Sequence, residues 1–170
     1  VLSFTAEEIW RTLAVQPGRH LGVSSVHLAS FPEVDAAWHD AELATRWQKL
    51  LTVRVVVQAQ LEIRRMEKLI GSSLEARVSL AAKGQMYDLL LEQDLPALFI
   101  VSDVKIQRVD TLPTTRMYPW PETKPEDDFA VIDVVRASGA KCERCWNYRD
   151  AVGKVRNHPT LCDRCVKAVQ

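Results

Sequence analysis

The sequence predicts an α+β protein with a long-helix, bundle-type segment, a small α/β unit with a three-stranded sheet, and a C-terminal four-cysteine hairpin. Residues 40–70 contain neither glycine nor proline and repeat apolar residues every three or four positions, as a helix does. Residues 72–136 contain stretches in which apolar and polar residues alternate, the period of a strand. Four cysteines, the only ones in the chain, lie between 142 and 165.

We expect three domains in this order: a partial helical segment at 1–71, the α/β unit at 72–136, and the cysteine-rich finger at 137–170. A proline-rich connector at 110–128 interrupts the α/β unit and contains four of the eight prolines. The chain begins with Val1 inside an apolar stretch, so we expect it to be a piece of a longer polypeptide.

The first helix is predicted from Thr5 to about residue 15. Thr5 is the expected N-cap, Glu8 closes a capping box, and Phe4 and Ile9 can form a hydrophobic staple. A short extended stretch is predicted at 25–28.

The long helix is predicted from about residue 40 to 70, with Gly71 as its C-terminal cap. The run 53–57 favours a strand by propensity, but the longer helical period on both sides outweighs it. One face of the helix is apolar and consists of Leu43, Trp47, Leu50, Val53, Val57 and Leu61.

The α/β unit is predicted as a strand at 74–82, a helix at 84–94, a second strand at 98–109 and a third at 129–136. If the first two strands pair directly, they should be parallel. The apolar third strand should be covered on both faces and leads directly into the finger.

The cysteine spacing indicates a structural zinc site. Cys142 and Cys145 form one C-x2-C pair, Cys162 and Cys165 form another, and two such knuckles on a hairpin give a closed tetrahedral centre. The sequence therefore predicts a zinc-finger hairpin. Iron at the same four thiolates and two disulfides are alternatives, and a thioredoxin-like redox pair fits less well because the two pairs match each other.

This metal should order the chain rather than catalyse a reaction, since four thiolates leave no open coordination position. His158 is expected to be a loop residue and not a ligand. No glycine-rich phosphate loop or nucleophile-elbow pattern occurs, so we predict no catalytic residue and favour a binding module.

Charge is divided unevenly along a chain whose net charge is zero. Residues 136–170 contain eight basic and three acidic residues, which makes the finger cationic. A phosphate backbone is a natural partner for such a surface, and a merely solubilising surface is the alternative. No apolar run is long enough to span a membrane.

Three blocks resemble the C-terminal part of bacterial isoleucyl-tRNA synthetases. They are Phe4-Thr5-Ala6-Glu7-Glu8-Ile9-Trp10, Lys68-Leu69-Ile70-Gly71-Ser72-Ser73-Leu74-Glu75-Ala76, and the two cysteine knuckles with Trp146. The resemblance implies an anticodon-binding helical segment at 1–71 and a parent enzyme that joins isoleucine to its tRNA with ATP. It also implies a cytoplasmic monomer whose catalytic and editing domains lie elsewhere in the same polypeptide.

The resemblance further implies that the finger contacts the anticodon stem-loop of tRNA(Ile). The predicted tRNA-binding residues are Arg144, Trp146, Arg149, Lys154, Arg156 and Arg164. An arginine can pair with phosphate, and an indole can stack on an unpaired base. Alternatively, Trp146 covers the metal sulfurs.

Two other functions remain open from the sequence. DNA-repair glycosylases of the formamidopyrimidine type end in a similar four-cysteine hairpin, although this chain starts with Val1 instead of the catalytic proline. A zinc ribbon that binds only protein is the other.

Overall fold

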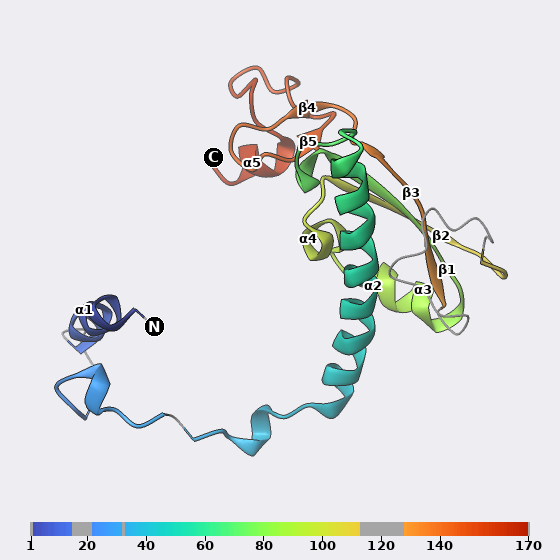
Figure 1. Cartoon of the computed structure of the whole chain (residues 1–170). Helices are drawn as coiled ribbons and strands as arrows, with labels where there is room; N and C mark the ends of the chain where they lie inside the picture. Colours follow the sequence, from blue (N-terminus) through green and yellow to red (C-terminus); the bar gives the residue numbers. More distant parts are fainter. Residues whose placement is uncertain (1, 15–21, 32, 113–127, 170) are drawn as a thin grey trace. The chain divides into compact units, whose positions relative to one another are not determined.

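The computed structural model confirms the predicted α+β class (Figure 1). It describes residues 2–14, 22–31, 33–112 and 128–169. The chain divides into two compact units, Val1–Asp40 and Ala41–Gln170. The domain boundaries expected at residues 71 and 136 stay a prediction, and most of the proline-rich connector lies outside the described residues. No helix in the described part of the chain is both long and apolar enough to cross a membrane.

The first unit contains helix α1 (Ser3–Ala14) and the 3-10 helices η1 (Val26–Leu28) and η2 (Ala36–Trp38). The predicted N-cap at Thr5 is wrong, because α1 already includes Ser3 and the N–H of Ala6 donates to the carbonyl of Leu2. The extended stretch predicted at 25–28 is wrong too. The side chain of Ser25 caps η1 there by accepting from the N–H of His27.

The side chain of Glu7 bonds α1 to the start of η1. Its Oε2 accepts from the hydroxyl of Ser25 at 2.8 Å and from the N–H of Val26 at 3.1 Å. The bond from Ser25 lowers the pKa of Glu7, as do those from Val26 and Arg11.

Helix α2 (Ala41–Met66) confirms the long helix but ends before Gly71. The N–H of Leu69 donates to the carbonyl of Arg64, that of Lys68 donates to Arg65, and Lys68 has a φ of 59°. This is a Schellman motif in which a lysine occupies the left-handed position usually taken by glycine. The predicted cap at Gly71 is therefore wrong. Its N–H instead donates to Oε2 of Glu75.

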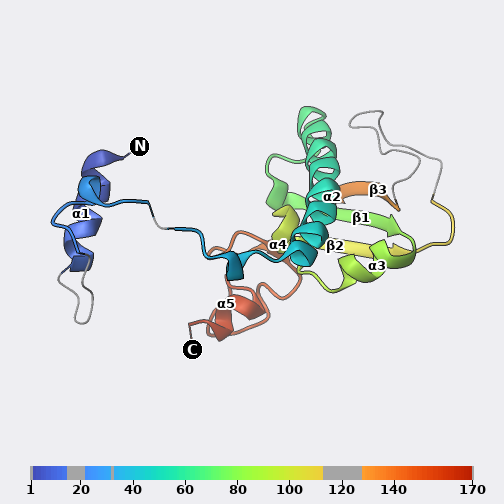
Figure 2. The ribbon, with the colours of Figure 1, turned by 90° about the horizontal axis from the view of Figure 1, so that it is seen from below.

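Three strands form the main sheet, in the order β2-β1-β3 (Figure 2). Strand β1 (Ala76–Ala82) follows the 3-10 helix η3 (Ser73–Glu75) and occupies the centre. It pairs in parallel with β2 (Asp103–Arg108), as predicted, and antiparallel with β3 (Phe129–Arg136). The third strand has its predicted bounds but lies at a sheet edge, and its residues are buried and half-buried in turn along most of its length.

The connection between β1 and β2 contains α3 (Gly84–Leu91) and α4 (Leu95–Phe99). The strand predicted from residue 98 therefore starts five residues too early. Asp94 accepts from the N–H of Ala97 and Pro96 occupies the first turn, which together start a helix. Ile100 then ends the helix in the left-handed conformation.

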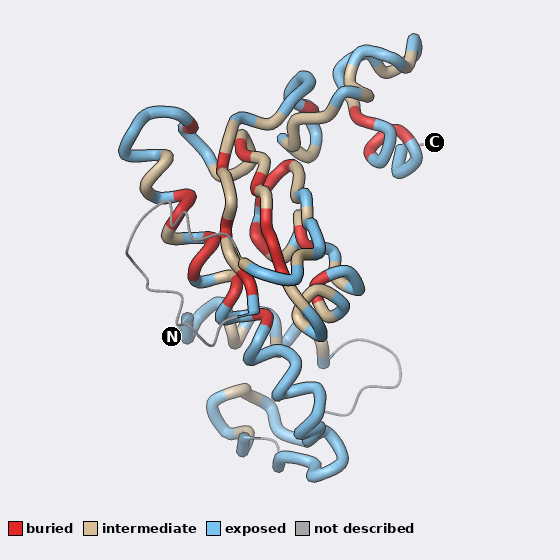
Figure 3. The backbone as a smooth tube through the Cα atoms, turned by 90° about the vertical axis from the view of Figure 1, so that its right-hand side faces the viewer, coloured by how far each residue is buried: buried red, intermediate tan, exposed pale blue. Residues whose placement is uncertain are grey.

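One apolar core joins α2 to the sheet (Figure 3, buried residues in red). Alternate residues of β1 at 76, 78, 80 and 82 share this core with α2, α3 and α4, so these helices pack on the same face. Leu50, Val53 and Leu61 of α2 are buried as predicted, whereas Leu43 and Trp47 are 47% and 44% exposed.

The finger consists of a hairpin of β4 (Ala140–Lys141) and β5 (Tyr148–Arg149), followed by the short helix α5 (Asp163–Lys167). The loop between β5 and α5 brings the second cysteine pair back to the first.

Candidate metal centre and nucleic-acid interface

The four cysteine sulfurs form one cluster. Sγ atoms of Cys142, Cys145, Cys162 and Cys165 lie within 4.8 Å of one another, and those of Cys145 and Cys162 are 3.7 Å apart. Zinc–sulfur bonds of about 2.3 Å in a regular tetrahedron place sulfurs about 3.8 Å apart. The predicted donor set is therefore brought together at a spacing that fits one structural zinc ion.

Backbone hydrogen bonds form each knuckle. In the first, the N–H of Trp146 donates to the carbonyl of Cys142 at 2.8 Å, and the N–H of Cys142 donates to that of Asn147 at 2.9 Å. In the second, Cys162 is the N-cap of α5, and its own N–H donates to Sγ of Cys142 at 3.3 Å. The second knuckle is thus bonded directly to a sulfur of the first.

The surroundings of the thiols favour thiolates unevenly. Burial opposes ionisation of Cys142, but the N–H groups of Cys145, Cys162 and Arg144 outweigh it and lower its pKa to about 6. Burial dominates at Cys162 and raises its pKa to about 12. A divalent ion supplies the charge that ionises such a thiol, because a coordinating thiol is deprotonated.

Arg144 and Arg164 connect the knuckles across the site. Nη1 of Arg144, in the first knuckle, donates to Sγ of Cys165 in the second at 3.7 Å. In the opposite direction, interaction with the sulfur of Cys145 in the first knuckle raises the pKa of Arg164 in the second. Both arginines are exposed on their outer sides, so each can also meet an outside anion.

Trp146 does not cover the sulfurs as a buried side chain, since it is 59% exposed. Its φ is 64°, a left-handed conformation that is costly for any residue with a Cβ. Nζ of Lys141 lies 5.2 Å from the ring centroid, within cation–π range. Lys141 was not predicted as a site residue, and only its place in the basic tail indicated it.

The other predicted contacts lie apart from the sulfurs. Lys154 and Arg156 are exposed in the loop between the knuckles, and Arg149 is half-buried in β5. His158 lies in the same loop and donates its N–H to the carbonyl of Val155. The sulfur cluster does not include it, as expected.

Apolar side chains contribute little to the finger. Its core consists of buried cysteines packed with Cys145, Val152 and Leu161. So small a core cannot offset the entropy of ordering the loop. Zinc binding contributes roughly 10–16 kcal/mol in small fingers, which makes the metal the main stabilising element here.

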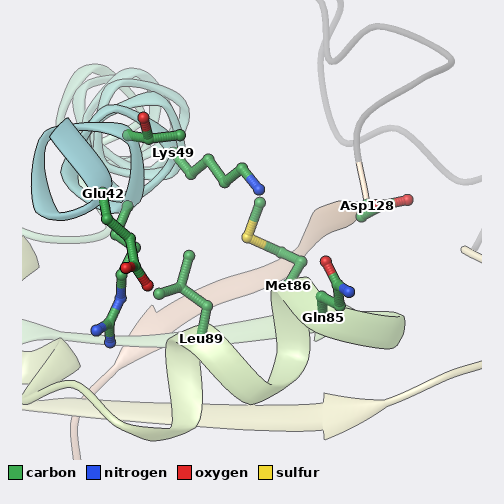
Figure 4. Close-up of a pocket in the computed structure, with 8 residues that line it drawn as sticks. Glu42, Lys49, Gln85, Met86, Leu89 and Asp128 are labelled. Carbon is green, nitrogen blue, oxygen red and sulfur yellow. The ribbon is translucent and has the colours of Figure 1, made fainter.

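Outside the finger, a concavity of about 550 Å³ lies between α2 and α3. Figure 4 shows Lys49 of α2 extending towards Met86 of α3, with Glu42 nearer Leu89. Arg46, which also lines it, is paired with Glu92 at 2.7 Å. The lining mixes opposite charges with apolar groups, and we assign it no role.

The chain is similar in sequence to a zinc-finger family and to isoleucine–tRNA ligases. A zinc-finger family described as "Zinc finger found in FPG and IleRS" matches residues 139–168. Isoleucine–tRNA ligase of Symbiobacterium thermophilum is 42% identical over 99% of this chain and 18% of the relative. The ligases of Geobacter sulfurreducens (42%) and Syntrophotalea carbinolica (43%) align with 100% and 98% of this chain and with 17% of their own lengths.

The chain thus spans less than a fifth of each of these relatives, whereas they cover nearly all of it. The family match includes the four cysteines and both arginines that cross between the knuckles. By sequence, the chain is a homologue of one segment of the isoleucine–tRNA ligases, and that segment includes their zinc finger.

Proposed function

We propose that this chain is the tRNA-binding region of an isoleucine–tRNA ligase. It grips the anticodon stem-loop of tRNA(Ile), so that catalytic and editing domains elsewhere in the polypeptide can attach isoleucine with the use of ATP. This role implies a cytoplasmic protein that acts as a monomer. The chain contributes binding and orientation, and the zinc ion contributes a rigid surface.

The observation that carries the proposal is Trp146. A large apolar ring is exposed directly after a metal ligand, at a backbone position that glycine adopts without strain. The exposed cation–π contact with Lys141 contributes only about 0.5–1 kcal/mol, so folding gives little reason for a tryptophan at that position. Strained, exposed residues on a rigid support are typical of functional sites, and stacking of a base on such a ring is worth about 1–3 kcal/mol.

Charge supports the same surface. Residues 137–170 carry seven basic and three acidic side chains, and zinc with four thiolates adds two negative charges. The finger stays cationic, and Lys141 is poised beside the stacking ring. Arg144 and Arg164 add guanidinium groups whose positions depend on the sulfurs. A base stacked on Trp146 would have a cation near its phosphate.

A binding competition tests the proposal. The zinc-loaded chain should bind tRNA(Ile) more tightly than a non-cognate tRNA of equal length, at one fixed salt concentration. Trp146→Ala should weaken that affinity by about 5- to 100-fold, with zinc content unchanged. Trp146→Phe keeps a ring and is the matched control, with a smaller loss expected. The proposal would be refuted if the chain bound both tRNAs equally and if Trp146→Ala bound tRNA(Ile) as tightly as the wild type.

The finger family alone also fits a DNA glycosylase, because its description names both FPG and IleRS. Whole-chain similarity to isoleucine–tRNA ligases favours tRNA over DNA. The same competition should include duplex DNA with an oxidised purine. Preference for that duplex would favour the glycosylase reading, and binding to neither nucleic acid would favour a protein partner.

A further inference from the structure

The hydroxyl of Ser102 joins the finger to the sheet. Ser102 lies between α4 and β2, and its side chain is fully buried. Its Oγ donates to the carbonyl of Leu74 at 2.5 Å and accepts from the N–H of Tyr148, in β5 of the finger, at 2.6 Å. A hydroxyl has one proton and two lone pairs, so a single serine oxygen can make both bonds.

The backbone of Ser102 is held independently of its side chain. Its N–H donates to the carbonyl of Ala76 at 3.1 Å, and the parallel pairing of β2 with β1 begins at the next residue. The hydroxyl therefore occupies a fixed place at the end of the sheet. Removing it should leave the strand register intact.

The covalent link cannot orient the finger alone. Strand β3 passes into the finger through Arg136 and Ala137, whose N–H donates to the carbonyl of Glu75 at 2.7 Å. One tether still allows rotation about its own direction. The bond between Ser102 and Tyr148 is a separate point of attachment, and it opposes that rotation.

Close packing does not replace this bond. A concavity of about 290 Å³ opens at the junction, and its lining includes Ser102 and Tyr148 together with Asp103 and Asp150. Asp150 accepts from the exposed hydroxyl of Ser138 at 3.3 Å, a contact within the finger. Few packing contacts hold a junction that contains an open polar crevice. Its geometry therefore depends more on the buried hydrogen bond than the geometry of a closely packed junction would.

We infer that Ser102 is a positioning residue, whose buried hydroxyl fixes the orientation of the zinc finger relative to the sheet and α2. The effect of this fixed orientation on RNA binding rests on the proposed function. An RNA that contacts both the finger and the rest of the chain binds more tightly when the two are already held in place, because less entropy is lost on binding.

Ser102→Ala in the zinc-loaded chain tests the inference. Ser138→Ala is the matched control, since it removes a hydroxyl from the same crevice without touching Tyr148. Exchange of the Tyr148 amide should accelerate about tenfold or more in Ser102→Ala, while the amide of Cys142 stays protected. Affinity for tRNA(Ile) should fall about tenfold, and zinc content should stay at one ion per chain.

Residual dipolar couplings separate orientation from stability. One alignment tensor should fit sheet and finger amides in the wild type and in Ser138→Ala. Ser102→Ala should require two tensors, with each part internally unchanged. A single tensor for Ser102→Ala would overturn the inference. So would two tensors in the wild type, a result that does not depend on whether Ser102→Ala folds.

The outcomes also separate this inference from the proposed function. If the wild type binds no tRNA but the tensors behave as expected, the proposed function fails and the positioning role stands. If Ser102→Ala needs two tensors yet binds tRNA with full affinity, the link from orientation to RNA binding is refuted.

Discussion

Nη1 of Arg144 lies 3.7 Å from Sγ of Cys165, so an arginine of one knuckle holds a ligand of the other. The same guanidinium is exposed on the finger surface and is a predicted tRNA contact. A guanidinium that contacts a metal ligand and also faces solvent can contact the metal centre and the bound RNA at the same time. Its two roles are separable, because a change in metal binding and a change in RNA binding are measured independently.

Arg144→Gln should therefore weaken tRNA affinity by about tenfold while the chain retains one zinc ion. Loss of a charge-assisted contact accounts for the affinity, and four thiolates hold the metal without it. A titration at fixed salt with zinc quantified in each preparation measures both. Arg77→Gln, on β1 outside the finger, is the control. Full affinity in Arg144→Gln would discard the RNA contact.

Trp146→Gly should move stability and binding in opposite directions. Glycine adopts a φ of 64° without strain, so the finger should gain about 1 kcal/mol while it loses the stacking ring. Trp146→Ala keeps the strain and loses the ring, which makes it the matched comparison. Thermal unfolding and tRNA binding of both variants measure the difference. A less stable Trp146→Gly would show that the indole holds the fold.

Gly139→Ala should disrupt the β4–β5 hairpin. Gly139 has a φ of 86°, and an added Cβ would clash with the backbone of Arg149 and Asp150. We expect a loss of about 2–4 kcal/mol in stability. Gly153→Ala is the control, because its φ is 89° while its nearest contact is 3.9 Å away, so it should lose only about 1 kcal/mol. Denaturant unfolding measures both losses of stability. If they are equal, the backbone has moved to relieve the clash of the added Cβ with Arg149 and Asp150.

Glu75 should make the stability of the sheet depend on pH. The N–H of Gly71, followed by the side chain of Arg136, lowers the pKa of Glu75 from its ordinary value. A lowered pKa stabilises the fold above the unfolded value, and that contribution is lost as pH falls through the folded value. Glu75→Gln should thus destabilise the chain at pH 7 and lose its effect at low pH.

A carboxyl NMR titration of Glu75, together with denaturant unfolding of both proteins at several pH values, checks this. Because the low pH also displaces zinc, sheet amides should be followed rather than finger amides. A folded pKa equal to or above that of Glu75 in the unfolded chain would contradict the prediction.

Sequence reasoning predicted what depends on period and spacing. The long helix, the strand predicted at 74–82 (observed from residue 76), the strand at 129–136 and the gathering of the four cysteines follow from local patterns, and the structure confirms them. The predictions were wrong where one or two residues determine how a helix ends or whether a helix or a strand begins. Lys68 adopts a left-handed turn that glycine was expected to make, and Asp94 with Pro96 starts a helix in a stretch predicted as strand.

The crossing of the knuckles by Arg144 and Arg164, and the bond from Ser102 to Tyr148, depend on pairs separated by many residues. No local pattern contains such pairs. Trp146 was predicted as a contact, but its strained backbone and its neighbour Lys141 emerge only when the knuckle is folded.

We propose that a zinc ion at the four thiolates orders a surface that binds tRNA. The most direct test is the affinity for the anticodon stem-loop RNA of tRNA(Ile), measured on one preparation before chelation, after chelation and after zinc is restored, with metal content determined each time. We predict one zinc per chain, an affinity that falls at least about tenfold without it, and recovery on reloading. A zinc-free chain that binds this RNA with undiminished affinity would show that the metal does not order the binding surface.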